Sequence, residues 1–185
     1  EAAPVEGAAA GEIYEVGPRI AVHSDDMGKI GTALHAAIAA ELVNPHRDDA
    51  VECAAALIRN GAGEGALDPR DAVDCARRLL DAVNDRFAPL RLLVEHPVAL
   101  ARDNGQVLRG WIDLLLETEQ GWIIIDHKSS PRPRSEWTSE AREYSGQLAA
   151  YASAIRGAGL ECAGCWVHFP VSGGLVEVVM PGDAG

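Results

Sequence analysis

The spacing of apolar positions divides the chain into a helical first part and a strand-rich second part. In three segments apolar residues recur every three or four positions, which predicts helices over residues 29–42, 48–60 and 68–87. The first helix has an apolar stripe formed by Ile30, Leu34, Ile38 and Leu42. The third begins at Asp68-Pro69, a capping residue followed by a proline that is tolerated at the first helical position.

After Pro89 the pattern changes to that of strands. Three strands are predicted over residues 91–100, 107–117 and 121–127, with turns at Asn104-Gly105 and Gln120-Gly121. The third is continuously apolar, which predicts a central strand buried on both faces. A helix over 135–156 and strands over 163–170 and 175–180 complete the order. The predicted fold class is α/β, a mixed β-sheet flanked by helices with an N-terminal helical segment.

The opening residues show no lasting periodicity. They consist mainly of Ala, Gly, Glu and Pro, which predicts a linker or extended segment over residues 1–25 and one domain over residues 26–185. A chain that begins inside a linker is expected to be the C-terminal part of a larger protein.

The composition limits the class of protein. The formal charge of −12 argues against a general basic surface for nucleic acid, so any phosphate contact must be local. No apolar run approaches the ~20 residues that span a bilayer, and no secretory pattern opens the chain. We therefore expect a cytoplasmic protein without a membrane partner. Four irregularly spaced cysteines are too few for a disulfide scaffold, so we expect free thiols.

Charged residues on two predicted neighbouring strands carry the candidate chemistry. Asp113 lies on the second strand, and Asp126 and Lys128 end the third. Residues two apart on a strand share a face, and an antiparallel pair can bring both carboxylates together. Two carboxylates placed together are suitable ligands for Mg²⁺. The charges of Asp126 and Lys128 are costly to bury alone, and a bound metal and a polar substrate would compensate them. The alternative is a solvated ion pair at the strand end.

Five short motifs together resemble a known family. They are Gly31-Thr32-Ala33-Leu34-His35, Glu95-His96-Pro97, Gly110-Trp111-Ile112-Asp113, Ile124-Ile125-Asp126-His127-Lys128-Ser129, and Gln147 followed four residues later by Tyr151. In this order and spacing they resemble the RecB and AddA branch of the PD-(D/E)XK nucleases over roughly residues 28–180. The resemblance implies a restriction-endonuclease-like core that hydrolyses DNA.

The resemblance also implies roles for individual residues. It implies Mg²⁺ or Mn²⁺ bound by Asp113, Asp126, the backbone carbonyl of His127, and His35. Lys128 would position or activate the attacking water, while Gln147 and Tyr151 would steady the lysine and contact the DNA. His127 occupies a position that is more often aromatic in the family. His35 alone, beside an apolar stripe, would equally fit an ordinary core histidine.

Several other residues have competing interpretations. Arg132, Arg134 and Trp137 follow the catalytic strand and could contact phosphate and stack on a base, or belong to a solvated loop. Glu95 is interpreted as structural or as a support of the site. Cys162 and Cys165 do not match the spacing of the four-cysteine iron-sulfur clusters found in relatives, so no cluster is expected.

The expected function is that of a Mg²⁺-dependent deoxyribonuclease, the C-terminal module of a helicase-nuclease in recombination and repair. Expected partners are single-stranded DNA ends, a helicase domain of the same full-length chain and a second nuclease or helicase subunit. The sequence contains no Gly-x-x-x-x-Gly-Lys-Ser/Thr loop, so ATPase activity is not expected in these residues. The alternatives are a catalytically inactive DNA-binding or scaffold module and a stand-alone exonuclease of phage or CRISPR type.

Overall fold

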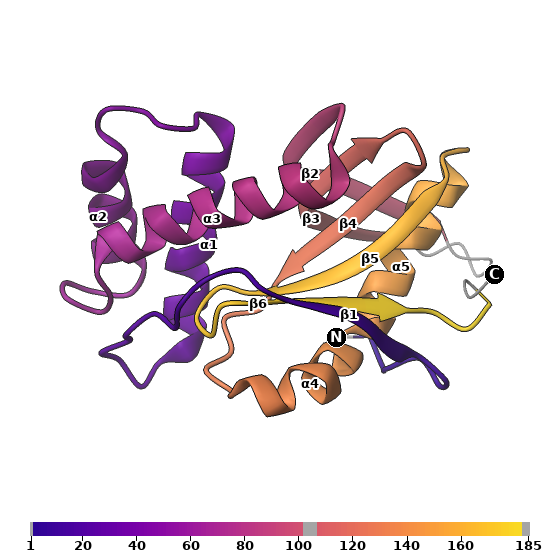
Figure 1. The fold of residues 1–185 in the computed structure, drawn as a ribbon, viewed down its shortest axis with the longest axis horizontal. Helices are drawn as coiled ribbons and strands as arrows, with labels where there is room; N and C mark the ends of the chain where they lie inside the picture. Colours follow the sequence, from indigo (N-terminus) through magenta and orange to yellow (C-terminus); the bar gives the residue numbers. More distant parts are fainter. Residues whose placement is uncertain (1, 102–106, 183–185) are drawn as a thin grey trace.

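The computed structural model describes residues 2–101 and 107–182 and contains one mixed sheet with helices on both faces (Figure 1). The strand order is β1-β6-β5-β4-β3-β2, with β4 and β5 parallel and all other neighbours antiparallel. The strands are β1 (Ala9–Glu15), β2 (Arg91–Ala101), β3 (Val107–Thr118), β4 (Gly121–His127), β5 (Cys162–Phe169) and β6 (Gly174–Val179). The helices are α1 (Met27–Val43), α2 (Ala50–Gly61), α3 (Pro69–Phe87), α4 (Trp137–Glu143) and α5 (Ser145–Gly157), with a 3₁₀ turn at Arg134–Glu136. The predicted α/β fold class is confirmed.

Local capping explains where two of the helices begin. The Asp26 side chain accepts a hydrogen bond from the Lys29 N–H (3.1 Å) at the start of α1, and the Asp68 side chain accepts one from the Arg70 N–H (2.9 Å) at the start of α3. Both bonds satisfy N–H groups that have no partner within the helix. The capping residue predicted for the third helix is therefore confirmed.

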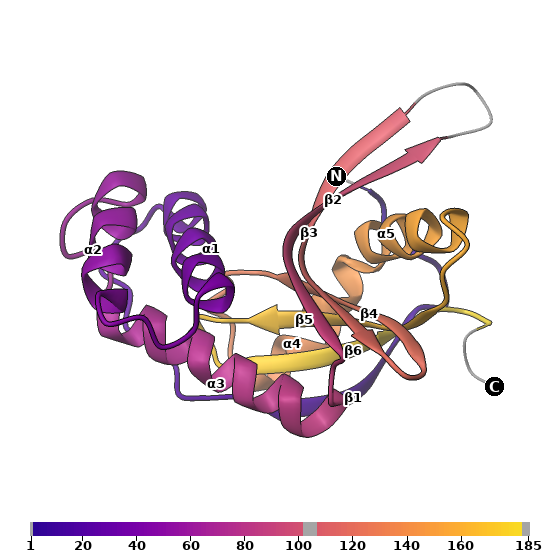
Figure 2. The ribbon, with the colours of Figure 1, turned by 90° about the horizontal axis from the view of Figure 1, so that it is seen from above.

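The sheet separates two hydrophobic cores, one under α1 to α3 and one under α4 and α5 (Figure 2). Strand β4 contributes to both, because Ile123 and Ile125 pack in the first core while Trp122 and Ile124 pack in the second. This strand lies between β3 and β5 and is almost entirely buried. The prediction of a central strand buried on both faces is confirmed.

The linker prediction is wrong for part of the N-terminal segment. Residues Ala9–Glu15 form the edge strand β1, which pairs antiparallel with β6. Ile20 is also buried, and its N–H donates to the Val171 carbonyl at 2.8 Å. The pairing partner lies more than 150 residues away in the sequence, so the local pattern of small and polar residues gave no sign of it.

The long helix predicted over residues 135–156 is divided in two. It is interrupted at Tyr144, between α4 and α5, immediately before Ser145 and Gly146. The Ser145 hydroxyl donates to the Arg142 carbonyl and accepts from the Val5 N–H, and a Cβ on Gly146 would collide with the Ala3 carbonyl. A Ser-Gly pair is a common place for a helix to kink, and here the N-terminal chain crosses it.

The β2–β3 hairpin extends well beyond the rest of the sheet (Figure 2). Its predicted turn at Asn104-Gly105 lies outside the described residues. The next turn, at Gln120-Gly121, is confirmed, and Gly121 has a φ of +125° that suits glycine. Among the described residues, no helix has the length and apolar character needed to cross a membrane.

Candidate active site

Asp113, in the middle of β3, lies close to Asp126 and Lys128 at the end of β4. Lys128 Nζ lies 2.8 Å from Asp126 Oδ2, and the backbone N–H of His127 donates to Asp113 Oδ2 at 2.6 Å. Asp113 is close enough for its negative charge to raise the pKa of Asp126. The juxtaposition that the sequence predicted for these three side chains is therefore present.

Gln147 links the acid, the lysine and a tyrosine. Its side chain accepts a hydrogen bond from Lys128 Nζ (3.0 Å) and donates to Asp126 Oδ1 (3.1 Å). It also donates to the Tyr151 hydroxyl at 2.8 Å, one helical turn along α5. The predicted proximity of Gln147 and Tyr151 to the site is thus observed, and one amide holds three functional groups in a fixed arrangement.

Tyr144 also belongs to this site, although none of the sequence motifs contains it. Its ring centroid lies 4.8 Å from Lys128 Nζ, within the range of a cation–π contact. The contact depends on the break between α4 and α5, since Tyr144 is the residue at which the chain turns. A continuous helical pattern had concealed that break.

Asp126 is buried at only 2% exposure, and burial raises its pKa to about 6. The nearby cation of Lys128 opposes this shift, and the negative charge of Asp113 adds to it. The carboxylate is therefore ionised at neutral pH, but at a cost to folding. Such a site favours the binding of an additional cation.

This cost predicts a pH-dependent effect of Asp126→Asn on stability in metal-free buffer. The pKa of Asp126 in the folded protein exceeds the ordinary 3.8, so folding favours the protonated carboxyl. Its contribution to the free energy of unfolding is therefore fully present below pH 3.8 and is lost as the pH rises through about 6. A pKa change of that size corresponds to about 3 kcal/mol. Urea unfolding of both proteins should show the variant gaining up to about this amount relative to wild type between pH 4 and pH 8. A difference that does not vary with pH would contradict the expected ionisation.

Three histidines form a column on the other face of β4. The His127 ring makes edge contacts with His35 of α1 and with His168 of β5, at centroid distances of 5.5 and 4.9 Å. The two Nδ1 atoms of His127 and His168 are 3.2 Å apart. Burial lowers the pKa of each of the three, so they are neutral at pH 7. A neutral imidazole is the form that binds metals.

The donor atoms at the site fit a hard divalent cation in chemical type. Asp113 and Asp126 supply carboxylates, and the buried Nε2 of His35 has no hydrogen-bond partner among the described residues. The charge of Asp113 also acts on His35, where it opposes the lowering of the pKa by burial. However, no three His, Cys, Asp or Glu side chains in the described ranges are close enough to form a ready-made metal cluster. The predicted ligand set remains a prediction.

Glu95, which the sequence indicates to be structural or a support of the site, lies opposite Asp113 in the β2–β3 pair. It has a φ of +52°, and its neighbours Val94 and His96 pair with the residues on either side of Asp113. Partial burial raises its pKa, and the charge of Asp113 adds to the effect. Glu95 thus lies within electrostatic reach of Asp113. Its unusual backbone conformation lies where the strand changes its facing, since Val94 packs against the core under α1 to α3 and Val98 against the core under α4 and α5.

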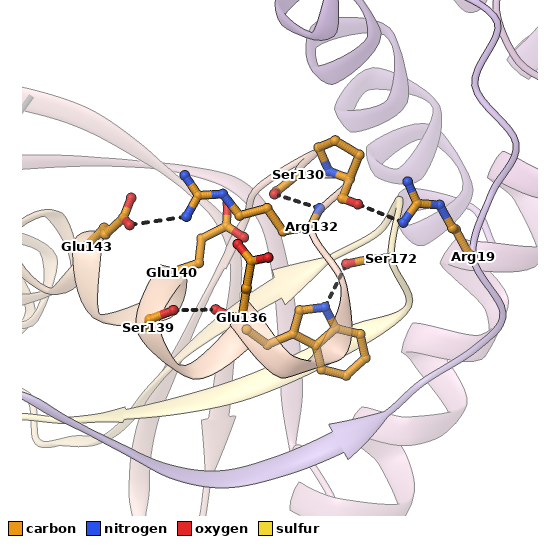
Figure 3. Close-up of polar contacts among 10 residues, drawn as sticks. Arg19, Ser130, Arg132, Glu136, Ser139, Glu140, Glu143 and Ser172 are labelled. Carbon is orange, nitrogen blue, oxygen red and sulfur yellow. Dashed lines mark hydrogen bonds and ion pairs between the residues drawn. The ribbon is translucent and has the colours of Figure 1, made fainter.

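The proposed stacking role of Trp137 is contradicted. Its Nε1 donates to the Ser172 hydroxyl at 3.0 Å (Figure 3). The Trp137 side chain is 2% exposed and stacks on Phe169. A DNA base cannot reach a ring that already lies in the hydrophobic core. The Trp137 ring instead packs α4 against the β5–β6 hairpin.

The two arginines of the same loop are engaged with acids. Arg132 pairs with Glu143 at 3.2 Å and lies 3.9 Å from Glu140, while Arg134 pairs with Glu15 of β1 at 2.6 Å (Figure 3 shows the first of these). These carboxylates offset the positive charge that was predicted to contact phosphate. The DNA-contact prediction for Arg132 and Arg134 therefore has no support from their surroundings.

The fold and the site together define a class of protein. A mixed sheet with carboxylates on two adjacent strands and a lysine at the end of the second is consistent with a restriction-endonuclease-like fold. The sequence model of the PD-(D/E)XK nuclease superfamily matches residues 12–176, and the chain belongs to this superfamily. The match begins within β1, in agreement with the place of that strand in the sheet. Comparison with curated proteins found no match.

Proposed function

We propose that this chain is a DNA nuclease domain that uses a divalent cation, Mg²⁺ or Mn²⁺, to hydrolyse phosphodiester bonds. The observation that supports it best is the convergence of Asp113, Asp126 and Lys128 in a chain of a nuclease superfamily. Asp126 is buried beside a second carboxylate, and Lys128 offsets only one of the two negative charges, so the site would attract a cation.

Each residue has a role in this proposal. Asp113, Asp126, the His127 carbonyl and His35 would hold the cation, which when bound supplies Lewis-acid activation of the phosphate and of water. Lys128 would orient the attacking water and stabilise the charge that develops on the phosphoryl oxygens. Gln147 holds the lysine and hydrogen-bonds Tyr151, and Tyr151 would contact the DNA.

The order of the motifs further supports membership of the RecB and AddA branch. In that case the chain acts within a helicase-nuclease of DNA recombination and repair, and a helicase domain brings single-stranded ends to it. DNA binding by the helicase domain would also explain how a chain with a net charge of −12 acts on DNA. A stand-alone exonuclease would need the same site.

A second candidate function is an inactive nuclease fold that binds DNA or serves as a scaffold. The observation that favours it is that no three potential ligand side chains within residues 2–101 and 107–182 are close enough to form a metal cluster. Metal binding is therefore the property that separates the two candidates most directly.

The test combines calorimetry with DNA cleavage. Wild type should bind Mn²⁺ and cleave labelled single-stranded or duplex DNA only when Mg²⁺ or Mn²⁺ is present. Asp113→Ala should weaken Mn²⁺ binding by at least about 10- to 100-fold, the loss typical of damage to a metal shell, and should reduce cleavage accordingly. Asp74→Ala, which removes an exposed acid on α3, should change neither.

The outcomes discriminate between the candidates. Mn²⁺ binding that is lost in Asp113→Ala, together with metal-dependent cleavage, supports the nuclease. If wild type binds no Mn²⁺ and leaves both DNA forms intact at millimolar metal, the nuclease proposal fails and the scaffold takes its place.

A further inference from the structure

The projecting part of the β2–β3 hairpin has two very different faces. On one face, Val98 and Ile112 pack in the core under α4 and α5, and a Cβ on Gly110 would lie 3.0 Å from the Tyr151 ring. The other face consists of Pro97, Ala99, Arg109 and Trp111, all exposed. We call these four residues the outer face of the hairpin. The two faces differ because successive side chains of a strand point to opposite sides of the sheet.

Trp111 is the prominent member of the outer face. It is 58% exposed, whereas Trp122, Trp137 and Trp166 are buried in the two cores. Its cross-strand partner is Pro97, and Arg109 pairs with Ala99 in the next row of the same face. The outer face therefore presents one large aromatic ring and one guanidinium group beside the small apolar side chains of Pro97 and Ala99.

The outer face lies next to the candidate active site along β3, and the facing of the strand changes at Asp113, because Ile112 packs in the core under α4 and α5 while Leu114 packs in the core under α1 to α3. Trp111 and Asp113 are two residues apart on β3, a separation of roughly 7 Å along the strand. That is about the axial length of two nucleotides of a helical strand. A nucleic-acid strand with its phosphate at Asp113 would thus bring the base of a nearby nucleotide to Trp111.

We propose that the outer face binds a single-stranded DNA segment beside the scissile phosphate, with a base stacked on Trp111 and the backbone near Arg109. This inference rests on the proposed nuclease function and names the part of the substrate that the domain holds. Stacking on an aromatic ring requires an unpaired base, so the surface selects single strands over duplex. The guanidinium group adds a local attraction for phosphate in a chain whose net charge is negative.

The binding test uses a fluorescein-labelled oligothymidylate at low salt in EDTA, so that binding is measured by anisotropy without cleavage. Trp111→Ala should weaken binding by about 5- to 140-fold, the range for loss of one stacked base. Trp111→Phe should retain most of the affinity because it keeps an aromatic face. Leu90→Ala is the matched control. Leu90 is 66% exposed, but it directly precedes β2 and is not part of the outer face.

A cleavage assay separates this inference from the proposed function. For a single-stranded substrate, Trp111→Ala should raise KM with a smaller effect on kcat. If wild type cleaves DNA and Trp111→Ala binds and cleaves it equally well, the outer face has no role and the nuclease stands. If Trp111→Ala loses oligonucleotide binding while wild type cleaves nothing with any metal, the binding surface stands and the nuclease proposal fails.

Two further outcomes would overturn the inference. One is a wild-type protein that does not bind the oligonucleotide at low salt. The other is a Trp111→Ala variant with unchanged DNA affinity but weaker self-association in sedimentation experiments. The latter would assign the outer face to contact with a second copy of the chain.

Discussion

Lys128→Ala should lower the rate of DNA cleavage by about 10²- to 10⁴-fold, the range for loss of a positioned catalytic group. Lys128 Nζ is held by Asp126 (2.8 Å), by Gln147 (3.0 Å) and over the Tyr144 ring, so its position is fixed before any substrate arrives. Such fixed charges stabilise a developing negative charge without reorganisation. Single-turnover cleavage of a labelled single strand at saturating metal would measure the effect on the chemical step.

The chain offers a matched control for this experiment, since it contains only one other lysine. Lys29 is exposed on α1 and pairs with Asp26 at 3.0 Å, so Lys29→Ala should leave cleavage unchanged. Lys128→Arg should not restore activity, because a planar guanidinium cannot take the place of a compact ammonium among these three neighbours. Cleavage by Lys128→Ala at the wild-type rate would remove the catalytic role assigned to this lysine.

The local structure around Lys128 was largely accessible from the sequence. The apolar run of β4 predicted a buried strand that ends where the charged residues begin. The two-residue spacing then put Asp126 and Lys128 on the same face of that strand. The four-residue spacing of Gln147 and Tyr151 likewise put both on one side of α5, where they now share a hydrogen bond. These predictions succeeded because each rests on the periodicity of a single element.

Predictions failed where the environment of a side chain is formed by residues that are distant in the sequence. Trp137 was assigned to the surface, yet Ser172 and Phe169 cover it more than 30 residues later in the sequence. Tyr144 joined the site only because the N-terminal residues cross Gly146 and α4 ends early. For Glu95 the structural and supporting interpretations both stayed open, because its positive φ leaves no trace in a strand-like pattern.

Strand β1 was also missed because its pairing partner, β6, is distant in the sequence. The packing of the segment that follows β1 can be tested at Gly173. Gly173 lies in the β5–β6 turn with a φ of +84°, and a Cβ there would come 1.9 Å from the Gly17 carbonyl oxygen. Its own carbonyl accepts hydrogen bonds from the N–H groups of Val16 (2.8 Å) and Gly17 (3.3 Å). The turn and the segment that follows β1 are therefore in direct backbone contact, with no space for a side chain between them.

Gly173→Ala should lower the free energy of unfolding by at least about 3 kcal/mol, which combines a strained positive φ with a backbone collision. For a domain of this size the melting temperature should fall by roughly 6–12 °C. Gly159→Ala is the matched control, because Gly159 also has a positive φ (+78°) but a Cβ there would meet nothing within 4 Å. The control should cost only about 1 kcal/mol. Equal losses in the two variants would mean that the segment after β1 is not packed against the turn, and with it the attachment of β1 to the edge of the sheet would be in question.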